Sequence, residues 1–170
     1  GLKNPGALAA AAFLGQHRHQ LPAIFGINVA VSPGVTDPDQ ECREIRESIA
    51  AFLDQCIRPA WFTLNLSCPN TDDDPGSHQT AARAHALCAA VIQQLQEFHI
   101  PLWVKISPDL SSEQYHALLR AFAETGVRAV IATNTLGSPA PDGTTAGIGG
   151  GQLHAHALNV VAALAQEKQR

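Results

Sequence analysis

The sequence lacks the features that mark proteins of membranes and of nucleic acids. No apolar run reaches the roughly 18 residues that a membrane-spanning helix requires. Eleven lysines and arginines are scattered against 15 acidic residues, which gives a net charge of −4. Because no basic stripe is available to neutralise phosphates, nucleic acid is not an expected partner. Apolar residues make up 45% of the 170-residue chain, enough for the core of one ordinary domain.

Cysteine is scarce, and its spacing argues against a zinc site or a disulfide framework. The four cysteines form no C-x-x-C pair. Three of them, Cys42, Cys56 and Cys88, fall in predicted helices, where we expect each to fill a small space in the core. This usage is typical of a reducing cytoplasm.

The eight histidines do not predict a metal site either. Two pairs lie two residues apart, His17 with His19 and His154 with His156. On a helix this spacing directs the two rings away from each other, so they do not converge on one ion. We therefore expect no bound metal.

Four apolar segments predict buried parallel strands, at residues 24–31, 61–67, 102–106 and 129–134. Their residues are almost continuously apolar rather than alternating, so we expect other elements to cover both faces of the sheet. Helical patterns fill the intervals. The clearest begins with the capping-box residues Ser111 and Gln114 and ends at Gly126. Further helices are predicted after Pro5, after Asp37, within residues 78–98 and from His154 onward.

This repeated β/α order indicates an α/β fold with two candidate architectures. One is an open doubly wound sheet, and the other is a (β/α)8 barrel. A doubly wound nucleotide-binding domain is expected to carry a glycine-rich phosphate turn after an early strand. The sequence has no G-x-G-x-x-G there, and its dense glycine run, residues 147–151, comes after the last predicted strand.

The most informative segment is Asn65-Leu66-Ser67-Cys68-Pro69-Asn70, which follows the apolar strand residues 61–64. A thiol and two carboxamides therefore emerge together where a strand gives way to a loop. An ionised Cys68 can act as a base or a nucleophile. Each amide offers a donor and an acceptor in one plane, which suits the edge of a flat, imide-like ring. The alternative is an ordinary turn at the end of a strand.

Polar residues gather late in the other strands as well. Asn28, Lys105, Thr133 and Asn134 all fall near a carboxyl end, which is the ligand-binding end of parallel β/α folds. Lys105 lies within an apolar run, so its ammonium needs an anionic partner unless the strand is at the edge of the sheet and the side chain reaches solvent. The electron-rich edge of a reduced flavin is one such anion. The residues alone favour an oxidoreductase or a lyase that acts on a cyclic amide.

The ordered set of motifs resembles the dihydroorotate dehydrogenase family. The segments that carry the resemblance are residues 1–6 (GLKNPG), 25–28 (FGIN), 65–70 (NLSCPN), 104–110 (VKISPDL), 131–135 (IATNT) and 146–150 (AGIGG). The resemblance implies a (β/α)8 TIM barrel that binds FMN, with about four of its eight β/α units in residues 1–170. Because the chain begins at Gly1 and contains no methionine, we expect it to be an internal segment of a longer protein.

The resemblance also implies roles for single residues in the oxidation of dihydroorotate to orotate, a step of pyrimidine synthesis. Cys68 would be the base that removes the C5 proton, while C6 delivers hydride to FMN. The pyrimidine would be held by Asn65, Asn70, Asn134 and Thr135, with Gly1 and Leu2 near its carboxylate. FMN would be held by Asn28, Asn65, Lys105, Thr133 and Gly150.

A cysteine base is typical of the soluble class of this family, so the resemblance implies a cytoplasmic enzyme and is compatible with a homodimer. The electron acceptor stays open among fumarate, NAD and quinone. The chain alone is expected to bind FMN weakly and to turn over little. Two other interpretations remain: a flavin domain of the dihydropyrimidine dehydrogenase type, and a non-catalytic interaction module. Asn70 favours the dihydroorotate interpretation, because the other type often has histidine there.

Overall fold

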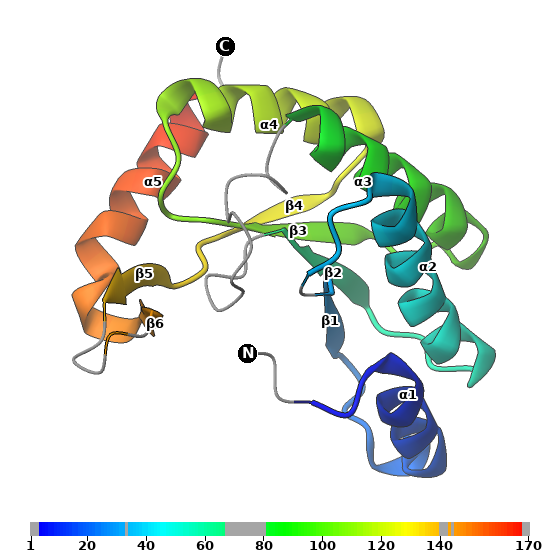
Figure 1. Cartoon of the computed structure of the whole chain (residues 1–170). Coiled ribbons are helices and arrows are strands. Elements are labelled where there is room, and N and C mark those ends of the chain that lie inside the picture. The colour runs from blue at the N-terminus through cyan, green and yellow to red at the C-terminus, as the bar shows by residue number, and fades with distance from the viewer. Residues whose placement is uncertain (1–3, 33, 67–80, 140–142, 144, 168–170) are drawn as a thin grey trace.

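The computed structural model describes residues 4–32, 34–66, 81–139, 143 and 145–167. Strands and helices alternate along most of this length (Figure 1). In chain order the elements are α1 (Ala7–Gln16), η1 (Arg18–Gln20), β1 (Gly26–Ala30), α2 (Pro38–Asp54), β2 (Trp61–Asn65), α3 (Ala81–Leu95), η3 (Gln96–Phe98), β3 (Leu102–Ile106), α4 (Ser112–Thr125), β4 (Ala129–Ala132), β5 (Leu136–Pro139), β6 (Thr145–Ile148), η4 (Gly150–Gln152) and α5 (His154–Glu167).

Four of the strands form one parallel sheet in the order β1-β2-β3-β4. Each strand pairs with the next one along the chain, with a helix in every crossover. A doubly wound sheet reverses its strand order at a switch point, whereas a barrel adds each strand beside the last. The observed order is that of the barrel, so this alternative from the sequence is confirmed.

The helices lie on one side of the sheet, as an arc with the strands on its inner side (Figure 1). The side chains that point toward the helices are buried and apolar, among them Ile27, Phe62, Leu64 and Val104. They pack against apolar side chains of α2, α3 and α4, and each fully buried leucine or isoleucine contributes about 1.5–3 kcal/mol. The core of the described chain therefore lies between the sheet and these helices.

The opposite face of the sheet is not covered by any described helix, so the expectation that both faces are covered is wrong for the described residues. Burial alternates along β1 and β3 instead of running through them. In β1, for example, Ile27 and Val29 are buried, whereas Gly26 and Asn28 between them are exposed. Successive side chains of a strand point to opposite faces. The exposed side chains therefore lie on the face that points away from the helices, which is the concave face of the sheet.

Local sequence signals set the helix ends as predicted. The Asp37 carboxylate accepts a hydrogen bond from the Gln40 N–H at 3.1 Å and caps α2. The Ser111 hydroxyl accepts from the Gln114 N–H at 3.2 Å, while the Gln114 side chain accepts from the Ser111 N–H at 2.8 Å. Gly126 ends α4 with a φ of 91°, a conformation in which a side chain would be strained. None of the described helices has both the length and the apolar character needed to span a membrane.

The sequence did not predict the antiparallel hairpin of β5 and β6, and one cysteine differs from expectation. Cys88 is buried in α3, where desolvation raises the pKa of its thiol to about 12. Cys56 is exposed and lies beyond the end of α2 with a φ of 56°, so its assignment to a helical core was wrong. The apolar pattern of α2 ends at Leu53, and the chain turns away from the helix directly after it.

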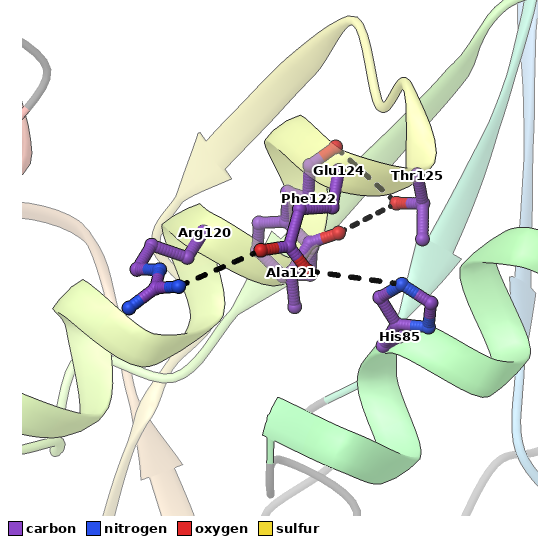
Figure 2. A network of polar contacts seen from close by, with 6 residues as sticks. All are labelled: His85, Arg120, Ala121, Phe122, Glu124 and Thr125. Carbon is purple, nitrogen blue, oxygen red and sulfur yellow. Dashed lines mark hydrogen bonds and ion pairs between the residues drawn. The ribbon is translucent and has the colours of Figure 1, made fainter.

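Polar contacts between neighbouring helices are of two kinds. On the surface, Glu124 of α4 lies 3.9 Å from His85 of α3 and 3.7 Å from Arg120 (Figure 2). Such exposed pairs contribute about 0–1 kcal/mol. Deeper in the molecule, Glu41 of α2 is fully buried and pairs with Arg83 of α3, whose side chain is 15% exposed. This second pair joins the first turns of two helices.

We predict that Glu41→Ala lowers the free energy of unfolding by about 3 kcal/mol, because it leaves the guanidinium of Arg83 buried without its carboxylate. Urea denaturation of the purified chain measures this loss. Glu47→Ala removes an exposed carboxylate from the same helix and is expected to stay within about 0.5 kcal/mol of the unaltered chain. Equal losses in the two variants would show that the buried pair has no special effect.

Candidate active site

Because the four strands are parallel, their carboxyl ends lie side by side at one edge of the sheet. The register aligns Ala30 of β1 with Asn65 of β2, and Asn65 with Lys105 of β3. Lys105 in turn aligns with Ile131 of β4. Paired residues of a parallel sheet point to the same face, so Asn65 and Lys105 are side by side on the concave side.

Lys105 occupies the third strand of four, paired on both sides. The alternative of a lysine on an edge strand is therefore wrong. Its side chain is half-buried, and the described residues give its ammonium neither an ion pair nor a hydrogen bond. A cation in this position favours a negatively charged or electron-rich ligand on the concave face.

Asn134 joins this row from the end of β4. Its Nδ2 donates a hydrogen bond to Oδ1 of Asn65 at 3.4 Å, and its Oδ1 accepts one from the Thr135 N–H at 2.9 Å. Its own N–H donates to the Ile106 carbonyl at 2.9 Å. Both asparagine side chains are only 8% exposed. The two amides are thus fixed relative to each other, and their donors and acceptors lie in one region.

Three other candidates from the sequence, Asn28, Thr133 and Gly150, are among the described residues. Asn28 is exposed on the concave face of β1, one row nearer the amino ends, and pairs with Thr63. The Thr133 hydroxyl donates to the Asn134 carbonyl at 2.9 Å. Gly150 opens η4 after β6 with a φ of 64°, and open space surrounds the place of its missing Cβ.

Four of the residues assigned from the sequence lie outside the described residues, namely Gly1, Leu2, Cys68 and Asn70. Their roles stay predictions. Cys68 follows Asn65, the last residue of β2, by three positions in the sequence.

Two tryptophans occupy the other half of the concave face. The rings of Trp61 and Trp103 stack with their centroids 4.2 Å apart and an interplanar angle of 12°. The indole of Trp61 lies over Gly26, where a Cβ would come within 2.3 Å of the ring. The concave face is therefore aromatic toward the amino ends of its strands and polar toward the carboxyl ends. A planar ligand with a polar edge needs both kinds of surface.

Sequence reasoning missed two side chains that brace the loop after Lys105. The Tyr115 hydroxyl donates to the Ser107 carbonyl at 3.0 Å, and burial raises the pKa of this phenol. Nε2 of His156, from α5, donates to the Pro108 carbonyl at 2.7 Å. In the sequence, the spacing of Tyr115 to Leu118, Leu119 and Phe122 indicates only a place on the apolar face of its helix, and His156 enters only as a possible metal ligand. Neither contact has a signal in the sequence, because each depends on how helices pack.

The hairpin of β5 and β6 packs against the loop that carries Asn134 and Thr135. A Cβ at Gly147 would lie 2.5 Å from Oγ1 of Thr135, so only glycine fits there without a shift. Thr135 directly follows Asn134, and its N–H holds the Asn134 amide. The glycine run thus supports the site, because Gly147 packs closely against Thr135.

Comparisons with known proteins concern the family and the fold of this chain. The family profile described as dihydroorotate dehydrogenase matches residues 1–170. The chain is 31% identical to the dihydroorotate dehydrogenase (quinone) of Streptomyces coelicolor, over 95% of this chain and 46% of that protein. It is 32% identical to the enzyme of the same name from Methylococcus capsulatus, over 99% of this chain and 51% of that protein. The chain therefore spans about half the length of these curated relatives.

Among solved structures, the chain is similar to the ligand-free crystal structure of DHODH from Eimeria tenella. The TM-score is 0.76 at 19% sequence identity, over 95% of this chain and 50% of that one. At this identity the likeness concerns the fold alone. The parallel β/α units match half of a TIM barrel, as the sequence predicted.

We predict that Gly147→Ala destabilises the chain by about 1–3 kcal/mol, because the new methyl group would overlap the Thr135 hydroxyl. Gly149→Ala is the matched control. Its Cβ would lie 3.5 Å from Cγ2 of Thr135, an ordinary contact, so only a small change is expected. The midpoints of urea denaturation measure both effects. If the two variants unfold at the same urea concentration, the close packing between the hairpin and the loop does not contribute to stability.

Proposed function

This chain belongs to the dihydroorotate dehydrogenase family, and from that premise we propose that the protein containing it oxidises dihydroorotate to orotate, with FMN as its redox cofactor. The single observation that carries the proposal is the row of polar groups on the concave face. Asn65, Lys105 and Asn134 come from three different strand ends, and the two asparagines share a hydrogen bond. Such a convergence suits a flat, charged ring with several hydrogen-bonding edges.

The substrate side of the site follows from the amide pair. Dihydroorotate is a cyclic imide with a carboxylate, so its ring edge presents alternating donors and acceptors that carboxamides can match. We assign its recognition to Asn65 and Asn134, with Thr135, Asn70 and the backbone of residues 1–2 as further contacts. Cys68 is the proposed base that takes the C5 proton of the substrate. A thiolate is needed for that step, and nearby cationic or hydrogen-bonding groups would favour it.

The described residues also fit FMN. Lys105 offers an ammonium without a partner among the described residues, and Asn28, Asn65 and Thr133 add neutral hydrogen-bonding groups. This is the donor set that the nitrogen- and oxygen-rich edge of an isoalloxazine requires, and Lys105 would stabilise negative charge there. When bound, FMN would supply the acceptor for the hydride that leaves C6 of the substrate. The protein's part is to hold the two rings in register and to exclude water.

The relatives and the residue at position 68 favour different electron acceptors. The relatives compared above carry the name dihydroorotate dehydrogenase (quinone). A cysteine at position 68 instead favours the soluble, cytoplasmic class. We propose a quinone as the acceptor, because the identity to the quinone enzymes extends over nearly the whole chain whereas Cys68 is one residue. The cytoplasmic location stays a separate proposal, and activity assays with quinone, fumarate and NAD distinguish the acceptors.

We predict that Cys68→Ala, in the protein that contains this chain, slows flavin reduction by dihydroorotate about 10²–10⁴-fold, the usual contribution of a general base. Anaerobic single-turnover absorbance measures the rate. Cys56→Ala removes an exposed thiol outside the site and should leave the rate within about twofold. An unchanged rate in Cys68→Ala would refute the assignment of the base. Faster reduction by dihydrouracil than by dihydroorotate in the unaltered protein would refute the substrate.

We predict that Lys105→Met weakens FMN binding about 10- to 150-fold, since a hydrogen bond to a charged group contributes about 1.5–3 kcal/mol. Fluorescence titration of the apoprotein with FMN gives the dissociation constant. Arg43→Met removes an exposed cation from α2 and serves as the control for net charge. Equal FMN affinity in both variants would mean that Lys105 does not contact the cofactor.

A further inference from the structure

Thr63, in the middle of β2, is a buried polar residue whose hydroxyl has no hydrogen-bond partner among the described residues. Four polar or charged residues of the described chain are buried, namely Glu41, Thr63, Asn65 and Asn134. Glu41 pairs with Arg83, and the two asparagines share a hydrogen bond. Thr63 is only 4% exposed, so its hydroxyl is the exception within this set.

A threonine in this position is unfavourable unless its hydroxyl is used. A buried hydroxyl without a partner loses its hydrogen bonds to water and gains none in return. Valine has the same shape, is equally suited to a strand and avoids this loss. The hydroxyl of Thr63 therefore indicates a partner that a ligand on the same face supplies.

The register places Thr63 at the boundary between the aromatic and the polar half of the concave face. Thr63 aligns with Asn28 of β1 and with Trp103 of β3. Paired residues of a parallel sheet point to the same face, so the three side chains share the concave side. Along β2 the same face carries Trp61 before Thr63 and Asn65 after it. A flat ligand that covers both halves of the face must cross this position.

We propose that Thr63 is a further cofactor-binding residue, whose hydroxyl donates a hydrogen bond to the electron-rich edge of the FMN ring. This assignment rests on the proposed function, which places FMN on the concave face. Asn28 lies beside Thr63 in the register, and Lys105 lies diagonally across from it, two residues beyond Trp103 on β3. The hydroxyl thus lies between two groups that are assigned to the same ring edge, and it can donate to a carbonyl oxygen or a ring nitrogen there.

The hydroxyl favours reduced FMN over oxidised FMN. Reduction makes the ring edge near Lys105 more negative, and a hydrogen bond to a charged acceptor is roughly twice as strong as one to a neutral acceptor. Thr63 therefore raises the reduction potential of the bound cofactor in the same direction as Lys105. Unlike a second lysine, it does so without adding a charge to the interior of the sheet.

The test is Thr63→Val in the protein that contains this chain, because this change removes the hydroxyl and keeps the shape of the side chain. Fluorescence titration of the apoprotein should give a dissociation constant for oxidised FMN that is about 3- to 10-fold higher. The affinity for reduced FMN should fall by about a further tenfold. This difference corresponds to a midpoint potential about 30 mV lower for a two-electron couple, which spectroelectrochemical titration measures.

Two further variants separate a contact with the cofactor from an effect on folding. Thr63→Ser keeps the hydroxyl and should retain the midpoint potential of the unaltered protein. Thr125→Val is the matched control, since it removes a hydroxyl that donates to the Ala121 carbonyl at 2.8 Å within α4 (Figure 2). It should leave both FMN measurements unchanged and lower the urea midpoint of the apoprotein. Thr63→Val should not lower that midpoint, because its hydroxyl has no partner to lose among the described residues.

The outcomes distinguish this role from the proposed function itself. If the unaltered protein binds FMN and Thr63→Val changes neither the dissociation constant nor the potential, Thr63 does not contact the cofactor, and the proposed function stands. If Thr63→Val lowers both FMN binding and the urea midpoint, and Thr63→Ser restores neither, the residue acts through packing and the assignment is wrong. An unaltered protein that binds no FMN would overturn the assignment and the proposed function together.

Discussion

The parallel register of four consecutive strands is the constraint on which the rest of this structure depends. It places Asn65 beside Lys105 and directs both to the face opposite the helices. It also ends β4 where Asn134 can reach back to Asn65. A shift of the register by one residue would turn Lys105 into the apolar layer between the sheet and the helices, where an unpaired ammonium is costly. The core and the candidate site are therefore fixed by the same pairing.

The concave face has an apolar half and a polar half, and this division determines which ligands it suits. The stacked Trp61 and Trp103 and the bare Gly26 provide a flat apolar surface near the amino ends. The amides and the ammonium lie at the carboxyl ends, where the loops that follow the strands add further groups. A flavin and a pyrimidine are both planar rings with polar edges, so one surface of this kind can serve both. Side chains outside this face, such as Tyr115 and His156, act by holding the loop after Lys105.

Much of the fold could be predicted from the sequence because its signals are local. The capping box at Ser111, the proline that starts α2 and the apolar strand residues each identify an element without knowledge of the rest. The motif order then indicated which strand ends meet. The hairpin of β5 and β6 was not predicted because its short, glycine-containing strands have no apolar periodicity. The same limit applies to the pair of Glu41 and Arg83, which are 42 residues apart, so that only helix packing brings them together. The exposed face of β1 was not predicted because apolar composition does not show which face of a strand is covered by other elements.

A crystal structure of the protein that contains this chain, with FMN and orotate bound, tests the central claim most directly. We expect both ligands at the carboxyl ends of the strands on the concave face. The Lys105 Nζ should lie within hydrogen-bonding distance, about 2.7–3.2 Å, of the flavin, and the Asn65 and Asn134 amides within the same distance of the ligands. Ligands bound on the helical side of the sheet, or at the amino ends of the strands with Lys105 in contact with neither, would contradict it.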